Sequence, residues 1–118
     1  MVESMDRLDL VFHSLADATR RDMMRRLTRQ DFSVGALAKN YELTLAAVSK
    51  HLMVLQKAKL ISKSRKGKQQ MIHLSDSALA PAAELLDQYR AMWEARLDSL
   101  DHYLKEGAQH DRKKTKRK

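Results

Sequence analysis

The lysines and arginines of residues 43–75 are the side chains whose types and spacing most clearly indicate a chemistry. This stretch holds seven basic residues and no aspartate or glutamate. Lysine and arginine neutralise phosphate, and a surface of one sign attracts a partner of the opposite sign. The stretch therefore favours contact with a polyanion over a merely solvated lysine-rich surface, which would ordinarily include some acidic residues.

Charge is unevenly distributed over the rest of the chain, which has 118 residues and a formal net charge of +8. Residues 1–42 are neutral overall, residues 76–111 carry a net charge of −5, and residues 112–118 carry +6. A basic middle between neutral and acidic segments is the charge pattern expected of a nucleic-acid-binding protein.

Length and composition exclude several classes of protein. The chain is long enough for one core, and 43% apolar residues suffice for folding. It has no cysteine, which excludes disulfides and cysteine-ligated metal sites. No glycine-rich phosphate loop, HExxH motif or apolar pair of carboxylates is present, so no enzyme, cofactor or metal is predicted. Without a signal peptide or a membrane-length apolar run, we expect a cytoplasmic protein with no membrane partner.

Residues 43–60, LTLAAVSKHLMVLQKAKL, are expected to form the helix that presents the first of these lysines. Val48, Leu52 and Leu55 recur at i, i+4 and i+7, which places them on one helix face. Thr44 is the expected N-cap, because its hydroxyl can accept a hydrogen bond from an early backbone N–H. The opposite face is small, hydroxylic and basic, which suits a DNA-reading helix, although an ordinary amphipathic surface helix shows the same pattern.

The segments before this helix are expected to brace it. Residues 7–15 and 19–28 have apolar residues at helical spacing, and Asp17 is the expected N-cap of the second helix. Ser33 is expected to cap a third, short helix that ends in a turn at residues 40–43. A short helix, a brief turn and a capped second helix form a helix-turn-helix, in which the first helix supports the second against the groove.

Residues 60–65 and 69–74 are expected to form a β-hairpin, because they alternate in character and flank a turn. Lys66, Gly67 and Lys68 separate the two runs, and glycine supplies the positive φ of the turn. A basic hairpin directly after a recognition helix is typical of a winged helix, where the wing follows the phosphate backbone or the minor groove. The predicted fold is therefore mainly α with a small β-hairpin.

A long last helix, from about Ala80 to Lys105, is predicted to offer a surface to a second subunit. Its apolar residues recur at near-heptad spacing and are Leu86, Tyr89, Trp93, Leu97, Leu100 and Leu104. A small body cannot cover so long a stripe, which favours pairing with a second copy, although packing within one chain remains open. Residues 107–118 are nearly devoid of apolar side chains and are predicted to be a disordered basic tail, which leaves residues 1–106 as the domain.

With these elements in place, the sequence resembles the ArsR family of bacterial winged helix-turn-helix transcriptional repressors over roughly residues 6–105. The matching stretches are SLADATRRDMMRRL, SVGALA, LTLAAVSKHLMVLQKAKLI and RKGKQQMIHLS, followed by a last helix that contains LLDQYRAMWEARLDSLDHYL. The last helix is similar to a branch of the family without metal-binding cysteines. The resemblance implies a homodimer, joined through its first and last helices, that binds an imperfect palindrome in a promoter.

The resemblance also implies roles for individual residues. The residues expected to face bases are Thr44, Leu45, Ala46, Ser49 and Lys50, which offer methyl contacts, hydroxyls and a cation for guanine acceptors. The residues expected to bind phosphates from the wing are Lys63, Arg65, Lys66 and Lys68. The residues expected to join the last-helix seam in the dimer interface are Leu8, Val11 and Phe12.

Several positions depart from the family pattern or remain open. Ala18 stands where proline commonly follows the capping aspartate, and Lys59 stands where glycine commonly ends the recognition helix. A left-handed Lys59 would cost about 1 kcal/mol. His102 with Asp98 is the only local candidate metal pair, and such solvated pairs are usually unliganded. His51 lies beside the apolar stripe, which favours a packed histidine over a ligand or a base contact.

The sequence thus predicts a sequence-specific DNA-binding transcriptional regulator that acts as a homodimeric repressor. The alternative is a helical protein-interaction module, antitoxin-like or an adaptor, that uses the apolar seam of the last helix. The arginines of residues 19–28 also allow two interpretations, phosphate contact or neutralisation by nearby aspartates. The operator, the regulated genes and any effector are not predicted.

Overall fold

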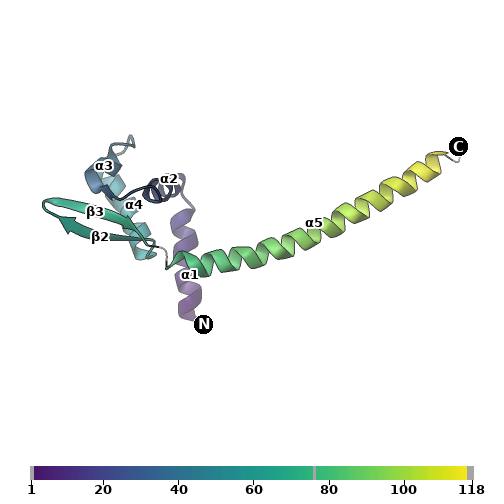
Figure 1. Ribbon diagram of the computed structural model, residues 1–118, viewed down its shortest axis with the longest axis horizontal. Helices are drawn as coiled ribbons and strands as arrows, with labels where there is room; N and C mark the ends of the chain where they lie inside the picture. Colours follow the sequence, from purple (N-terminus) through teal and green to yellow (C-terminus); the bar gives the residue numbers. More distant parts are fainter. Residues whose placement is uncertain (1, 76, 117–118) are drawn as a thin grey trace. The chain divides into compact units, whose positions relative to one another are not determined.

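The computed structural model describes the backbone of residues 2–75 and 77–116 and the side chains of residues 6–75 and 77–108. Among these residues the elements in chain order are α1 (Val2–Leu15), α2 (Ala18–Leu27), β1 (Phe32–Ser33), α3 (Val34–Ala38), α4 (Leu45–Lys57), β2 (Ile61–Lys66), β3 (Gln69–Leu74) and α5 (Leu79–Lys116) (Figure 1). The predicted fold class, a mainly helical winged helix with a small antiparallel sheet, is confirmed. The chain divides into two units, one up to Ala82 and one from Ala83 onward.

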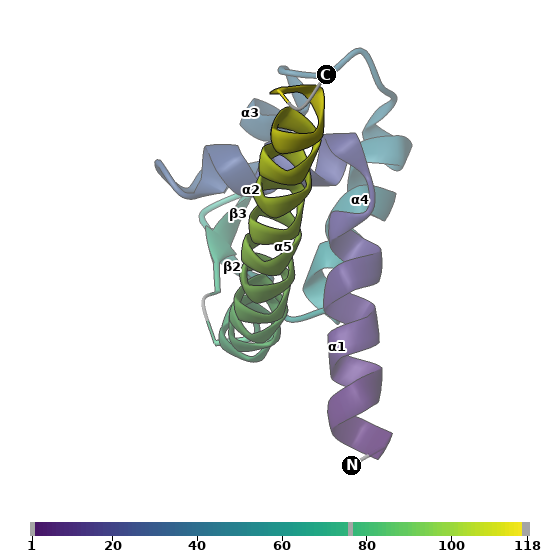
Figure 2. The same cartoon turned by 90° about the vertical axis from the view of Figure 1, so that its right-hand side faces the viewer.

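The first unit is organised around a core to which α1 to α4, the sheet and the first turn of α5 contribute. Its buried apolar residues are Val11, Met23, Met24, Leu27, Leu37, Val48, Leu52, Leu55, Ala58, Leu60, Ile61, Ile72 and Ala82. Within this unit α1 lies alongside α4, as Figure 2 also shows. The helical spacing of the apolar residues places them on the faces that meet, so burial of these faces is the main force that holds α4 in place.

The sheet contains a strand that the sequence did not reveal. Its strand order is β1-β3-β2, and β1 pairs with β3 in an antiparallel register that joins Phe32 to Ile72 and Ser33 to Met71. With two residues, β1 is too short to show an alternating pattern, and its pairing depends on β3, which lies about forty residues later. The strand fixes the base of the hairpin to the segment between α2 and α3.

The hairpin has a shorter loop than the sequence suggested. Lys66 belongs to β2 and pairs with Gln69, which leaves a loop of two residues, Gly67 and Lys68. Gly67 has a φ of +63°, and a type II′ turn places glycine at this first central position. The tight loop places the basic residues of the tip, Lys66 and Lys68, at the end of the two-stranded ribbon.

Two helices are longer than predicted. The first begins at Val2 rather than near residue 7, and the last continues to Lys116 rather than ending near Lys105. The described backbone is helical up to residue 116, within the stretch for which the sequence predicts a disordered tail. Gly107 costs a helix only about 1 kcal/mol, and the alanine, glutamine, lysine and arginine that follow are good helix formers. Residues 117 and 118 lie outside the described part, and the domain boundary at residue 106 remains a prediction.

None of the helices in the described ranges combines the length and the apolar character that a membrane crossing requires.

Candidate nucleic-acid interface

The helix α4 is anchored by its inner face and by its first turn. Val48, Leu52 and Leu55 are each at most 1% exposed, which confirms the predicted apolar stripe. The Thr44 Oγ1 accepts a hydrogen bond of 3.1 Å from the backbone N–H of Ala47, which confirms the predicted N-cap. This cap satisfies a backbone donor that would otherwise lack a partner, so the helix begins at a defined residue.

The outer face of α4 presents most of the residues predicted to face bases. Thr44, Leu45, Ala46 and Lys50 are exposed, and Ser49 is half-buried. Met53, which is not among the residues predicted to face bases, is 62% exposed one turn beyond Ser49. Leu45 is 61% exposed, so two large apolar side chains face outward from a helix whose own core face is already filled. Surfaces of this kind suit contact with thymine methyl groups beside polar base contacts.

The end of α4 explains how a lysine is tolerated where glycine was expected. Lys59 has a φ of +62°, so it adopts the left-handed conformation whose cost the sequence analysis considered. The N–H of Leu60 donates to the Leu55 carbonyl at 3.0 Å, and the N–H of Lys59 donates to the Gln56 carbonyl at 2.9 Å. This is a Schellman motif, in which the buried Leu60 packs beside Leu55 and offsets the strain at Lys59.

A polar cluster of Asp22, Arg26 and Tyr41 connects α2 to the turn between α3 and α4. The Tyr41 hydroxyl donates to Asp22 Oδ2 at 2.7 Å, and Arg26 Nε donates to the same oxygen at 2.9 Å. The Arg26 guanidinium also lies 5.8 Å from the centroid of the Tyr41 ring. These contacts fix the turn that sets the angle between the two helices of the helix-turn-helix.

The ionisation of this cluster follows from its contacts. The hydrogen bond from Tyr41, with those from Arg26 and Arg25, lowers the pKa of Asp22 to about 2. Burial of the ring, together with the Asp22 carboxylate, raises the pKa of Tyr41 to about 12. Both shifts favour a charged carboxylate and a neutral phenol, the pair that makes the stronger hydrogen bond.

The arginines of α2 are largely occupied within the protein. Arg25 and Arg26 form ion pairs with Asp22. Arg21 Nη1 donates to the Leu15 carbonyl at 2.8 Å, and Arg20 donates to carbonyls at the end of α1. Of the two interpretations that the sequence allowed, neutralisation by a neighbouring aspartate therefore holds for two of these arginines, while two others bind backbone.

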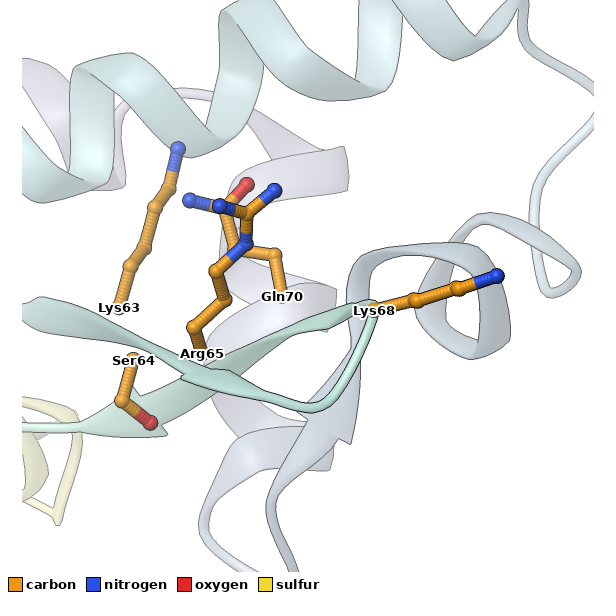
Figure 3. Close-up of a pocket in the computed structure, with 5 residues that line it drawn as sticks. All are labelled: Lys63, Ser64, Arg65, Lys68 and Gln70. Carbon is orange, nitrogen blue, oxygen red and sulfur yellow. The ribbon is translucent and has the colours of Figure 1, made fainter.

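The wing, defined as residues 61–74, presents its basic side chains on different sides. Lys63, Arg65 and Gln70 project to one side of the hairpin, Ser64 projects to the other, and Lys68 extends from the tip (Figure 3). These five residues line a hollow of about 450 Å³. The structure thus brings together three of the four predicted wing cations. Lys66 is also exposed, at the end of β2.

The opposite side of the wing carries a hydrogen-bonded series of side chains that the sequence gave no reason to connect. His73 Nδ1 lies 2.8 Å from Asp31 Oδ2, and His73 Nε2 lies 2.5 Å from Ser64 Oγ. Because the carboxylate only accepts, His73 Nδ1 carries a proton, and Nε2 accepts from Ser64 when the ring is neutral. The series links β2 and β3 to Asp31, the residue before β1.

The residues predicted for a dimer interface differ in their availability. Val11 is 2% exposed and belongs to the core of its own chain, so it is not free to contact a partner. Leu8 and Phe12 are partly buried against the same core. The α5 seam is exposed in the single chain, from 49% at Tyr89 to 65% at Trp93, over Leu86, Tyr89, Trp93, Leu97, Leu100 and Leu104.

Exposed residues of α5 outside the seam add apolar and polar surface. Met92 and Tyr103 are 60% and 71% exposed, which widens the apolar stripe. His102 Nε2 lies 3.0 Å from Glu106 Oε1 one turn onward, so its close partner is not the Asp98 that the sequence suggested as a metal co-ligand.

Comparisons with known proteins agree with this geometry. Residues 15–63, which include α2, α3 and α4, match a family described as a helix-turn-helix domain. The chain is 35% identical over 81 residues to an HTH-type transcriptional regulator of Mycobacterium tuberculosis, a match that covers 69% of this chain and 76% of that protein. It is also 35% identical over 57 residues to the transcriptional repressor SdpR of Bacillus subtilis, which covers 48% of this chain and 63% of that protein.

Solved structures of similar fold include an ArsR-like transcriptional regulator from Rhodococcus sp. RHA1. It superposes with a TM-score of 0.67 at 28% identity, over 83% of this chain and 92% of that chain. A homodimeric winged helix-turn-helix DNA-binding domain from Mycobacterium bovis has a TM-score of 0.60 at 22% identity, over 75% of this chain and 83% of that chain. At this identity the second likeness concerns the fold alone.

Proposed function

The chain belongs to the ArsR family of helix-turn-helix transcriptional regulators, and we propose that it is a homodimeric repressor that binds a palindromic operator. It is a DNA-binding transcriptional regulator and not an enzyme. The observation that carries the finer proposal is the acid-free surface of α4 and the wing. Residues 43–75 contain lysines, arginines and histidines but no aspartate or glutamate.

In this proposal α4 enters the major groove and the wing binds the backbone. Thr44, Leu45, Ala46, Ser49 and Lys50 face base edges within the α4 segment, residues 44–58. Because apolar and small side chains dominate this surface, methyl contacts and DNA shape supply much of the specificity, and Lys50 supplies the one cationic base contact.

The wing cations act on phosphates rather than on bases. Lys63, Arg65 and Lys68 line one hollow, and Lys66 lies beside them at the end of β2. Phosphate contacts fix the register of a protein on DNA and give an affinity that falls steeply with salt, because each neutralised phosphate releases counterions.

The exposed α5 seam supports the dimer part of the proposal. Its residues recur at near-heptad spacing, and each is about half exposed or more in the single chain. An apolar stripe of this length is costly to leave in water, and a second copy of the same helix offers a matching stripe. A twofold dimer places two α4 helices on one duplex, which accounts for a palindromic operator. The proposal also includes repression and a cytoplasmic location. Repression is the activity that the name of the Bacillus subtilis relative states for that protein.

Selection from a random-sequence DNA pool with the full chain tests the proposal. We expect enrichment of duplexes with two inverted half-sites spaced by about one helical turn or a multiple of it, and footprinting of the chain's own promoter region should protect such a site. Binding to the selected duplex should weaken steeply as salt is raised. If no sequence is enriched and no site is protected at low salt, the proposal is wrong.

A second candidate function rests on the same α5 seam. An exposed apolar helix face can bind a different protein, as in an antitoxin-like or adaptor module, by presenting its seam to the partner. Light scattering on the purified chain separates the two candidates, because a stable homodimer would already cover the seam. A monomer that forms a defined complex with another protein would favour the second candidate.

A further inference from the structure

His51 lies on the recognition helix α4 but faces the body of the protein. Its side chain is 22% exposed, and its Nδ1 atom lies 3.2 Å from the Arg20 guanidinium and 3.8 Å from the Asp17 carboxylate. The ring therefore contacts the beginning of α2, as the packed-histidine interpretation of the sequence anticipated. What the sequence did not show is the identity of the partner.

Arg20 connects His51 to a third helix. Its Nε donates to the Ser14 carbonyl at 2.7 Å, and its Nη2 donates to the His13 carbonyl at 3.1 Å. Both carbonyls belong to the last turn of α1, where carbonyls lack the partners that the middle of a helix provides, although the His13 carbonyl also accepts from the Ala16 N–H at 3.1 Å. The side chain of Arg20, which belongs to α2, thus connects the end of α1 to the middle of α4.

The hydrogen-bonding chemistry of the two residues assigns the protonation state of His51. Arginine has only donors, so the Nδ1 atom that faces Arg20 must present a lone pair. The ring is then neutral with its proton on Nε2. A protonated ring has donors at both nitrogens and would set an N–H against the guanidinium, so this contact exists only in the neutral form.

We propose that Arg20 and His51 are positioning residues that hold the recognition helix against α1 and α2 in the geometry that sequence-specific DNA binding requires. The inference rests on the proposed function, in which α4 contacts bases. Base contacts need the side chains of α4 within fractions of an ångström, whereas phosphate contacts tolerate wider variation. Loss of the Arg20–His51 contact should therefore weaken specific binding more than nonspecific binding.

Protonation of His51 gives the proposal a readout that simple destabilisation lacks. Among the described side chains, the charged groups within ion-pair or hydrogen-bond distance of the ring are Arg20 and Asp17, both at the start of α2. The α1 helix contributes backbone carbonyls to Arg20, and the His13 side chain is exposed. The Arg20 backbone N–H is the main group that holds the pKa of Asp17 below its ordinary value. Asp17 therefore stays charged, but at 3.8 Å it replaces the lost hydrogen bond only in part.

The first experiment tests the geometry without DNA. Long-range ¹H–¹⁵N correlation spectra of the full chain report which ring nitrogen of each histidine carries the proton at neutral pH. We expect the His51 ring to be neutral with the proton on Nε2, and Arg20→Lys to change its tautomer balance. A proton on Nδ1 in the wild type would overturn the proposal whatever the protein binds.

The second experiment compares two substitutions of His51. Asn places its Oδ1 where the histidine carries Nδ1, so His51→Asn keeps an acceptor for Arg20 that no proton can remove. His51→Phe keeps a ring of similar size but removes the acceptor. His102→Asn, a change on the exposed surface of α5, serves as the control for histidine loss. Unfolding curves and light scattering establish that each variant remains folded and in the same assembly state.

Affinity is measured for the duplex that the wild type selects from the random pool and for a random-sequence duplex of equal length. We expect His51→Phe to lower the ratio of specific to random affinity about tenfold, while His51→Asn keeps the wild-type ratio. At a pH low enough to protonate the histidines, this ratio should be lower than at neutral pH for wild type and His102→Asn but unchanged for His51→Asn.

The outcomes separate this inference from the proposed function. If the wild type selects no sequence, the proposed function fails, and the tautomer experiment still decides whether the contact exists. If the wild type selects an operator but His51→Phe keeps the wild-type ratio, the positioning role is overturned while the proposed function stands. A ratio that falls equally with pH in His51→Asn would also overturn it.

Discussion

The recognition helix and the wing present basic side chains to the same kind of partner but are held by different forces. In α4, Val48, Leu52 and Leu55 are fully buried, and a cap and a Schellman motif define the two ends. In the wing, every residue from Ser64 to Gln70 is exposed, and Ile61 and Ile72 are the residues that enter the core. The distal wing therefore depends on strand pairing and on surface hydrogen bonds.

This difference fits the two tasks that a DNA-binding surface performs. Close packing holds a helix in one position, because the interior of a protein leaves no room for small shifts, and contacts to base edges need such precision. A hairpin outside the core can adjust to the path of a phosphate backbone, and phosphates accept varied geometry.

The largest effect is expected from loss of packing beneath α4. Leu52→Ala should lower the free energy of unfolding by about 2 to 5 kcal/mol, because it removes buried atoms and leaves a cavity. Met53→Ala is the matched control, because the Met53 side chain, next to Leu52 in the sequence, is 62% exposed. Its truncation should change the free energy of unfolding by less than about 0.5 kcal/mol. Urea unfolding followed by circular dichroism, at one protein concentration, measures both. Similar effects of the two substitutions would show that packing does not hold α4.

The next effect concerns discrimination among DNA sequences. Lys50→Ala on α4 should reduce the preference for the selected duplex over a random one by about 1 to 3 kcal/mol. Lys68→Ala at the wing tip should instead weaken both complexes alike and reduce the salt dependence, because it removes a phosphate contact. Fluorescence anisotropy at several salt concentrations distinguishes the two patterns. Equal losses on both duplexes for Lys50→Ala would remove its base-contacting role.

A moderate effect on stability is expected from the cluster that orients the helix-turn-helix. Tyr41→Phe should cost about 1 to 2 kcal/mol near neutral pH, because it removes a hydrogen bond to a charged carboxylate. Asp22 has its pKa lowered from 3.8 to about 2, so its stabilising contribution is complete above about pH 4 and is lost as the pH falls through about 2. Wild type and variant should therefore converge in acid. Unfolding curves between neutral and acid pH test this, and a constant difference would contradict it.

A smaller effect of opposite sign is expected at the end of α4. Lys59→Gly should raise the free energy of unfolding by up to about 1 kcal/mol, because glycine adopts a φ of +62° without the clash that a Cβ introduces. Lys57→Gly provides the contrast, since it places glycine in the last helical turn and should destabilise by about as much. Thermal unfolding of both variants measures the effect. A less stable Lys59→Gly would indicate that the lysine side chain stabilises the motif in another way.

The smallest effect on stability is expected in the wing. His73→Asn removes the link between Asp31 and Ser64, whose side chains are exposed, so the cost should be below about 1 kcal/mol. Its effect on DNA binding should be similar for selected and random duplexes, in contrast to His51→Phe in α4. A loss of sequence preference in His73→Asn would show that the wing is positioned as strictly as the recognition helix.

Much of the local structure follows from patterns that a few neighbouring residues create. The caps at Asp17, Ser33 and Thr44 accept their hydrogen bonds as predicted, because capping depends on the residue type three positions before the donor. The hairpin required only alternation and a glycine, although its loop is one residue shorter than predicted. The place of Lys59 where glycine commonly ends the helix identified the position at which the structure has a left-handed residue.

Features that join distant parts of the chain escaped the sequence. The strand β1, the Arg20–His51 contact and the Asp31–His73–Ser64 series each connect residues between 9 and 42 positions apart. No local pattern marks such pairs, because the side chains involved are common surface residues whose partners are chosen by packing. The same reason explains Val11, which has the spacing of an interface residue but is covered by its own chain.

The amino-acid sequence is sufficient to indicate the class of partner and the order of the elements. Charge segregation over residues 43–75 and apolar periodicity are properties of the chain that any fold must accommodate. The tertiary structure alone decided which cations are free and which are already paired. It engages Arg20, Arg25 and Arg26 inside the first unit and leaves exposed Lys50, Arg65, Lys66 and Lys68, because only packing decides which neighbours each charge meets.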